Sequence, residues 1–522
     1  IRDRCRIQQP FCILLSVVPT LSEKQMRVIG GISVILFALL TSFLSLEAQQ
    51  TPGEILPVRQ ITLDNGMRLV ILKRPGPPTI SFTVQFNVGG VNERLGTTGI
   101  AHLLEHMLFK GTTSVGTKNL EAELELYPWM DSAHDSLVEV RASGDSVRTL
   151  ELSERIAQLE DSAAVFIESN EFDHILTRAG ARGLNATTTN ESTVYFVDLP
   201  ANRAELWFAL EADRMVNPVF REFYSERDVV AEERRMRVEM NPVGALTETH
   251  LASAFSVHPY GVPVVGYMAD LQVMSRQNVE RYYRLYYGPN NAIVGIVGDL
   301  DPDQIEAWAR EYFAPIPKAE LPPAVTAVEP PQEVERRTEL EFDAQPQLQI
   351  SWHVPAGTDP DAPSLAILSS MLTGGRRSRL YRSLVLESRV ATSVFSSLGT
   401  GMRYPQLLQI SATPRAPHTT IQIEELIYEE LELLIQEGPS DSELQRVRNQ
   451  ISAGTVRRIQ SNIGLAFQLV ESVALFNDWR ETFRYSNKLR AVTADDVIRI
   501  AETYLNQSNR TVTTLVKTEY PG

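Results

Sequence analysis

Alternation of apolar and polar residues predicts β-strands near the beginning of the folded chain. The run from Arg59 to Leu72 predicts two short strands, because Asp64-Asn65-Gly66 interrupts it with a sequence typical of a hairpin turn. The next run, from Ser81 to Val88, alternates apolar and polar residues, as expected for a half-buried strand. We therefore expect a β-hairpin followed by a third strand.

Helical periodicity follows these strands. Between Gly99 and Thr112 the leucine, methionine and phenylalanine side chains form an apolar surface, and Lys110-Gly111-Thr112 supplies helix stop signals. A charge-rich stretch from about residue 117 to 179 has apolar residues spaced for amphipathic helices, so we interpret it as a helical insertion. Its charges are typical of a solvated face.

A proline-rich stretch divides the chain into two similar halves. The residues 314–335 hold six prolines, which interrupt helices and central strands and therefore indicate a linker. A shift of 264 residues places the strand that ends at Val88 on the one that ends at Trp352, and Met107-Leu108 on Met371-Leu372. We interpret the halves, 49–313 and 336–522, as a duplicated domain of α+β class, with two α/β-sandwich lobes that each pack helices against an antiparallel-rich sheet.

Composition narrows the functional classes. The 522 residues are 43% hydrophobic and 22% charged, which is ordinary for a globular protein of several domains. The net charge of −16 argues against a nucleic-acid-binding protein, because such proteins need clustered lysine and arginine to displace counterions.

The first 48 residues resemble a leader rather than part of the fold. Lys24 and Arg27 precede an apolar run that ends at Leu46, and the small residue Ala48 follows, so we expect a signal peptide cleaved after Ala48. Met26 is the expected start of translation. The alternative to a cleaved signal peptide is an uncleaved membrane anchor. Both cysteines, Cys5 and Cys12, precede this cleavage site, so the mature chain would have a net charge of −18 and no thiols, as suits a periplasmic or secreted protein.

The segment His102-Leu103-Leu104-Glu105-His106 carries the main candidate chemistry. Residues four apart share a helix face, so His102 and His106 can bind one metal ion, while Glu105 can flank that ion as a general base. This order is the inverted zincin motif, H-x-x-E-H. In the second half the same register holds Ala366, Ser369 and Ser370, so that copy has lost the metal chemistry.

A catalytic zinc ion usually has three protein ligands and a water, so two histidines need a further partner. The acidic segment from Glu226 to Arg235 is the best candidate, because Glu226 and Glu233 are seven residues apart and share a helix face. One of them can bind the metal while the other supports a histidine. The alternative interpretation is that this segment is only part of the exposed surface, as acidic helical segments more often are.

With these motifs, the chain resembles the pitrilysin-like or insulinase-like zinc metallopeptidases, which include the mitochondrial processing peptidases. The resemblance is carried by the segments Gly99–Thr112, Leu184–Thr189, Glu226–Glu233 and Tyr287–Ala292. It implies one Zn²⁺ per chain held by His102, His106 and Glu233, with Glu105 as the general base.

The same resemblance assigns further roles and a shape. It makes Glu226 a carboxylate that supports a histidine ligand, and leaves Glu232 as the fallback ligand. It gives Asn185 and Ala186 a backbone-binding role on an edge strand to which an extended substrate adds. The two lobes together would form half of a clamshell.

Two features depart from the family pattern. Between His106 and Glu233 lie 126 residues, more than the family has, and the helical insertion accounts for the excess. The family's inactive half often carries an arginine and a tyrosine that hold substrate, whereas the matching positions here are Val385 and Thr392. We therefore expect the protein to form a dimer. One hypothesis is a heterodimer, in which a related zinc-less chain supplies the arginine and the tyrosine.

The resulting expectation is a zinc endopeptidase acting on peptides or unfolded polypeptide segments. A non-catalytic structural or binding subunit of the same fold is the main alternative, but such a subunit need not retain ligands and base together. A metal-scavenging protein is a third possibility, and it would have no need of Glu105.

Overall fold

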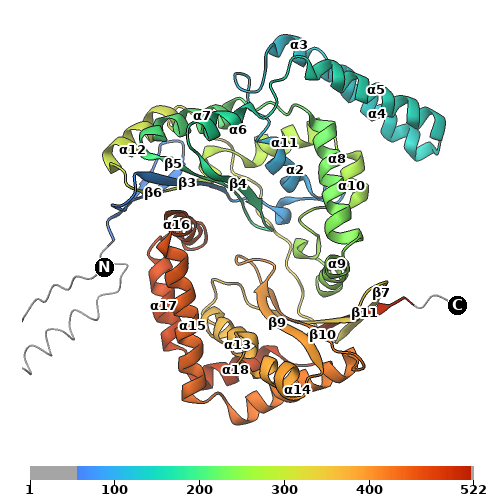
Figure 1. The fold of residues 1–522 in the computed structure, drawn as a ribbon, viewed down its shortest axis with the longest axis vertical. Coiled ribbons are helices and arrows are strands. Elements are labelled where there is room, and N and C mark those ends of the chain that lie inside the picture. The colour runs from blue at the N-terminus through green and yellow to red at the C-terminus, as the bar shows by residue number, and fades with distance from the viewer. Residues whose placement is uncertain (1–55, 519–522) are drawn as a thin grey trace, which may run out of the picture. The chain divides into compact units, whose positions relative to one another are not determined.

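The computed structural model describes residues 56–518. The expected leader, with Cys5, Cys12, Met26 and Ala48, lies outside these described residues. Strands form two mixed sheets that are packed with helices, which confirms the α+β class (Figure 1). The strands are β1 (Val58–Thr62), β2 (Arg68–Lys73), β3 (Thr79–Phe86), β4 (Arg182–Thr188), β5 (Thr193–Pro200), β6 (Ala292–Gly298), β7 (Arg336–Phe342), β8 (Gln347–Val354), β9 (Ala391–Gly399), β10 (Gln406–Pro414) and β11 (Arg510–Lys517).

The first sheet has six strands in the order β1-β2-β6-β3-β5-β4. The expected hairpin is present, since β1 pairs antiparallel with β2 and Asn65 in the turn donates to the carbonyl oxygens of Phe313 and Ile316. Only β2 and β6 run parallel, and β4 lies at one edge of the sheet.

The second sheet has five strands in the order β7-β11-β8-β10-β9. This order repeats that of β2-β6-β3-β5-β4, and in both sheets the first pair is parallel while the others are antiparallel. The shared strand order supports the interpretation of a duplicated unit. Residues 316–335, between the two sheets, form neither helix nor strand.

The helices of the first half are α2 (Ile100–Met107), α3 (Leu120–Leu124), α4 (Tyr127–Ser143), α5 (Ser146–Ala164), α6 (Glu171–Arg178), α7 (Ala204–Val216), α8 (Phe223–Arg234), α9 (Pro242–Ala254), α10 (Met268–Val273), α11 (Arg276–Tyr286) and α12 (Pro302–Trp308). Those of the second half are α13 (Ala362–Thr373), α14 (Thr420–Glu437), α15 (Asp441–Gln460), α16 (Asn462–Phe476), α17 (Glu481–Ala491) and α18 (Ala494–Tyr504).

Helices cover both faces of the first sheet. On one face Phe82 of β3 stacks on Trp207 of α7, with ring centroids 4.3 Å apart. On the other face α16, which belongs to the second half of the chain, buries Leu469 and Val473 against β2 and β6. In the opposite direction α9 of the first half packs on the second sheet, where His250 lies between Ser351 and Thr513.

Helices α4 and α5 form a hairpin that extends beyond α8 (Figure 1). They lie within the stretch 117–179, where the sequence predicts helical segments. Among the described residues no single helix is long and apolar enough to span a membrane, although α15 and α16 together, bent by 110° at their junction, meet that criterion of length and composition.

Candidate metal centre

Helix α2 holds His102 and His106 in place because its other side is anchored in the core. Leu103, Leu104 and Met107 are completely buried, and replacing a leucine of this kind with alanine typically costs about 2–5 kcal/mol of stability. The two imidazole rings lie edge to face with their centroids 4.9 Å apart.

The beginning of α2 is fixed by a glycine and a carboxylate. Gly99 has φ +85°, and a Cβ atom there would lie 2.6 Å from the carbonyl oxygen of Val265, so a larger residue would not fit. Glu93 accepts hydrogen bonds from the backbone N–H groups of Gly99 and Ala101 at 2.8 and 2.9 Å, which caps the helix. Burial raises the pKa of Glu93 to about 8, although both of these hydrogen bonds oppose that shift.

Helix α8 brings a carboxylate to the two histidines. The Oε2 atom of Glu233 lies 3.5 Å from Nε2 of His102 and 3.6 Å from Nε2 of His106. One donor atom from each residue lies within 4.8 Å of the other two. Donors bound to a tetrahedral zinc ion at 2.0–2.2 Å are separated by about 3.3–3.6 Å, so both distances to Glu233 match that geometry.

The hydrogen bonding of Glu233 leaves one oxygen free for a cation. Its Oε1 atom forms an ion pair with Arg237, whereas its Oε2 atom is buried and has no hydrogen-bond partner among the described residues. An unpaired buried carboxylate oxygen is costly, and a bound cation would satisfy it. Glu232, the fallback ligand, is half exposed and pairs with Arg235, so it lies outside the cluster.

Glu226 orients His106. Its Oε1 atom is 2.9 Å from Nδ1 of His106, so the imidazole donates from Nδ1 and leaves the lone pair of Nε2 facing Glu233. Lys110 contacts the other oxygen of Glu226 at 2.6 Å. Burial would raise the pKa of Glu226, but the hydrogen bonds from His106 and Lys110 outweigh it and lower that pKa to about 2.

His102 is suited to bind as a neutral imidazole. Burial, and to a smaller extent the charge of the neighbouring His106, lower its pKa to about 3. Nitrogen ligands bind metal through an unprotonated lone pair, so this shift favours the form that a metal ion needs. Burial would also lower the pKa of His106, but the hydrogen bond and charge of Glu226 outweigh it and raise that pKa, so a metal ion must displace a proton there. Two imidazole nitrogens and one carboxylate oxygen form a donor set that fits a zinc ion.

Glu105 lies next to the donors without joining them. Its Oε2 atom accepts a hydrogen bond of 2.5 Å from the hydroxyl group of Thr188 on β4, its one hydrogen-bond donor in residues 56–518. Burial raises the pKa of Glu105, while the hydrogen bond from Thr188 partly offsets the shift. A carboxylate with a raised pKa is better suited to carry a proton at neutral pH.

The edge strand β4 carries Asn185 and Ala186. It pairs with β5 on one side, and no strand among the described residues pairs with its other side. The side chain of Asn185 accepts a hydrogen bond from the backbone N–H of Ala186, and Asn185 is exposed. An open edge next to Glu105 is the geometry needed for strand addition.

Sequence reasoning missed four residues that shape this site, namely Glu93, Lys110, Thr188 and Arg237. Lys110 and Thr188 lie within the motif segments quoted above, so their types were visible but their partners were not. Glu93 and Arg237 lie outside those segments and act through contacts that the sequence pattern does not show.

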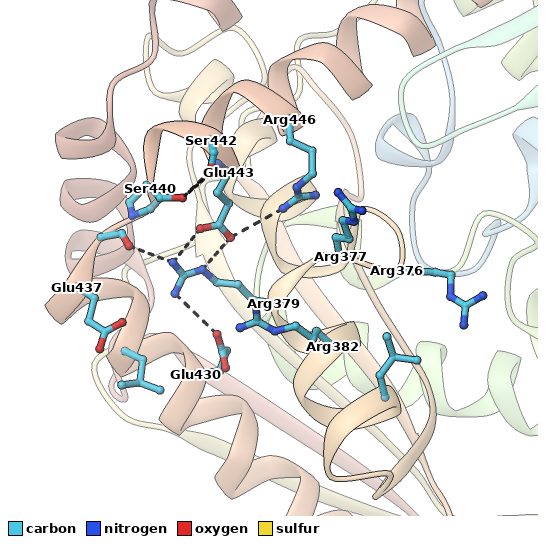
Figure 2. A pocket seen from close by; sticks show the side chains of 14 residues that line it. Arg376, Arg377, Arg379, Arg382, Glu430, Glu437, Ser440, Ser442, Glu443 and Arg446 are labelled. Carbon is cyan, nitrogen blue, oxygen red and sulfur yellow. Dashed lines mark hydrogen bonds and ion pairs between the residues drawn. The ribbon is translucent and has the colours of Figure 1, made fainter.

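A large cavity in the second lobe is not part of this site. Its volume is about 930 Å³, and it is lined by arginines and glutamates, with Arg379 held between Glu430 and Glu443 (Figure 2).

Val385 is half buried against the second core, and Thr392 is exposed on β9. Neither side chain has the guanidinium or phenol group that the family's pair provides.

Two family models match the chain in succession. The model described as Insulinase (Peptidase family M16) matches residues 68–133 and 165–267. The model described as Peptidase M16 inactive domain matches residues 274–451. All the residues of the candidate metal centre lie in the first match. The interruption at residues 134–164 falls in the α4–α5 hairpin.

Individual relatives cover nearly the whole chain. The zinc protease PqqE of Helicobacter pylori is 27% identical over 494 residues, covering 93% of this chain and 97% of the relative. The crystal structure of a protease from Helicobacter pylori has a TM-score of 0.75 at 24% identity, covering 88% of this chain and 100% of that chain. The periplasmic protease PqqL from Escherichia coli has a TM-score of 0.65 at 16% identity and is covered to only 47% of its length, against 88% of this chain. The chain belongs to the insulinase-like family of peptidases, family M16.

Proposed function

We propose that this protein is a zinc-dependent endopeptidase that hydrolyses peptides or unfolded polypeptide segments. The observation that carries the proposal is the convergence of His102, His106 and the unpaired Oε2 atom of Glu233 beside Glu105. A zinc ion bound there supplies Lewis-acid polarisation of the scissile carbonyl group and lowers the pKa of water.

The residues of the chain supply the remaining steps. Glu105 takes a proton from the attacking water and later donates it to the leaving amine nitrogen as the peptide C–N bond breaks. Thr188 holds the Oε2 atom of Glu105 and thereby fixes the orientation of the carboxylate. Glu226 holds His106 in the tautomer that presents Nε2 to the metal.

Substrate binding through β4 accounts for the proposed substrate class. An extended peptide that pairs with the open edge at Asn185 and Ala186 gains main-chain hydrogen bonds with little demand on its sequence. Such binding requires an unfolded segment, because a folded substrate has its backbone groups already paired.

The main alternative is a non-catalytic subunit of the same fold. The family model described as inactive matches residues 274–451, which exclude the whole donor set. A binding subunit would not need Glu105, and neither would a metal-scavenging protein. The presence of base and donors together therefore favours an enzyme.

Replacing Glu105 tests the proposal directly. Glu105→Gln should retain zinc, because Glu105 is not a donor, and should lower kcat by about 10²–10⁴-fold through loss of the base. Peptide hydrolysis and zinc content are measured on the same preparation, with Glu125→Gln, an exposed glutamate, as the matched control. Wild-type turnover by the Glu105→Gln variant would exclude the proposed role.

Pairing with another chain and export complete the proposal. Val385 and Thr392 leave the chain without the family's arginine and tyrosine, which supports pairing with a related zinc-less chain that carries them. The relation to PqqL, about twice as long in its solved chain, is consistent with such pairing. We also propose a periplasmic or secreted location, on the basis of the leader pattern before Ala48.

A further inference from the structure

The α4–α5 hairpin contacts the helix that carries Glu226 and Glu233. Residues 134–164, which include most of the hairpin, are not matched by the family model. Yet buried and partly buried polar contacts join this hairpin to α8 and α11, although α8 lies about 90 residues further along the chain than α4. A segment with no part in the zinc site thus contacts the element that supplies its third donor.

His134 of α4 contacts the first half of α8. Its Nε2 atom lies 2.7 Å from Nη1 of Arg227, and its ring stacks on Tyr224 with centroids 4.8 Å apart. A guanidinium group can only donate, so Nε2 accepts and the imidazole proton sits on Nδ1. His134 is 1% exposed, so this hydrogen bond is shielded from water and its geometry is fixed by packing.

Glu160 of α5 caps the beginning of α8. The residue before the helix, Glu222, has φ +55° and makes no hydrogen bond to cap the helix with its own side chain. Instead the backbone N–H of Ser225 donates to Oε1 of Glu160 at 2.9 Å. A carboxylate at this position satisfies an otherwise unpaired helix N–H and interacts favourably with the positive end of the helix dipole.

Asp131 of α4 completes the contact surface. It accepts a hydrogen bond of 2.7 Å from the hydroxyl group of Tyr224 on α8 and one of 2.6 Å from Arg276 on α11. The guanidinium of Arg276 in turn lies 3.6 Å from the ring centroid of Tyr127. The hairpin therefore fixes the position of α8 relative to α11 and also relative to the hairpin.

These contacts fall on both sides of Glu226. Ser225 precedes it and Arg227 follows it, so the hairpin fixes the turn of α8 that orients His106. Glu233 lies two turns further along the same 12-residue helix, which transmits a tilt or shift at its beginning to the donor near its end.

We propose that the α4–α5 hairpin clamps α8, with His134 and Glu160 as positioning residues for the metal centre. This inference rests on the proposed zinc function. A clamped helix presents Glu226 and Glu233 in the bound geometry before the metal arrives, so less ordering opposes binding. Removing supports of metal ligands typically costs about 10–100-fold in metal affinity.

The test measures zinc affinity in full-length variants by competition with a chromophoric chelator. His134→Leu and Glu160→Leu remove the polar contacts, while His134→Gln and Glu160→Gln keep an acceptor atom. Glu151→Leu is the matched control, because Glu151 lies on α5 but pairs only with the exposed Arg148 of the same helix. The visible absorption of bound Co²⁺ reports the geometry of the donors in each variant.

The clamp predicts an order of effects. Both leucine variants should bind zinc about tenfold more weakly or worse, and their Co²⁺ spectra should change, while the glutamine variants lie closer to the wild type. Glu151→Leu should bind as the wild type does. Unchanged zinc affinity and spectra in both leucine variants, or an equal loss in Glu151→Leu, would overturn the clamp. Failure of the wild type to bind zinc would instead refute the proposed function.

Discussion

Helix phase separates Glu233 from Glu232, two residues of the same type. Each step along an α-helix rotates the side chain by about 100°, so Glu233 shares the face of Glu226 and Glu232 does not. Accordingly Glu233 reaches both histidines, while Glu232 pairs with Arg235 in solvent. From the sequence, helix phase restricts the candidates for the third metal donor to the face that carries Glu226 and Glu233. The structure adds the orientation of each carboxylate oxygen.

Thr188 provides a prediction at the residue scale. Thr188→Val keeps the shape of the side chain but removes the hydroxyl donor to Glu105. A hydrogen bond to a charged group is worth about 1.5–3 kcal/mol, so kcat should fall by about tenfold or more while KM and zinc content stay near wild type. Steady-state kinetics with a fluorogenic peptide measure both constants.

The neighbouring threonine is the control for that prediction. Thr187 lies on the opposite, exposed face of β4 and its side chain makes no hydrogen bond within the described residues. Thr187→Val should therefore leave kcat unchanged. A Thr188→Val variant with wild-type kcat would show that the hydroxyl group does not orient the base.

At the scale of elements, short-range patterns were sufficient for much of the fold. The β1–β2 hairpin with its Asp-Asn-Gly turn and the helix around His102 follow from local alternation, spacing and turn chemistry, and both are present. The sequence does not reveal how the elements meet. Contacts such as Asp131 with Tyr224, or Thr188 with Glu105, join residues more than 80 positions apart and depend on tertiary packing.

The buried His134 predicts a pH dependence of stability. Burial first, and Arg227 second, lower its pKa to about 4 in the folded chain, from an ordinary value near 6.5. Asp131 partly opposes this shift and Arg141 adds to it. As the pH falls below about 6.5 the unfolded chain binds the proton before the folded chain does, so stability is lost progressively down to about pH 4.

Comparison with His134→Gln isolates this effect, because glutamine does not titrate. The stability advantage of the wild type over the variant should shrink by about 2 kcal/mol between pH 7.5 and pH 5. Urea unfolding of the zinc-free chains at several pH values measures the difference, and titrations shared by the two chains cancel. A stability advantage that does not change with pH would show that folding does not lower the pKa of His134.

At the scale of the whole molecule, the two sheets share a strand order, but within residues 56–518 the candidate metal-donor cluster lies in the first lobe alone. Helix α13 follows β8 as α2 follows β3, and it holds Ala366, Ser369 and Ser370 in the region that corresponds to the motif. Ser369 is buried and shares a hydrogen bond of 3.1 Å with Ser396, so its role here is structural. Loss of the donors therefore left a lobe that still folds around its own core.

The absent arginine and tyrosine give a prediction at this scale. The zinc-loaded chain alone should hydrolyse peptides slowly, and a related zinc-less chain with that pair should raise the rate and form a heterodimer with it. Sedimentation velocity and peptide hydrolysis on the same mixtures measure both effects. His102→Ala is the control, since it should still pair but remain inactive. Full activity of the chain as a monomer would rule out the need for a partner.

Metal binding by His102, His106 and Glu233 underlies every role proposed for this chain. Zinc content after removal of loosely bound metal, compared between wild type, Glu233→Ala and Glu232→Ala, tests it. We expect one zinc ion per chain in the wild type and in Glu232→Ala, and a large loss in Glu233→Ala. A wild-type chain without zinc, or a Glu233→Ala variant that keeps as much zinc as the wild type, would contradict the account.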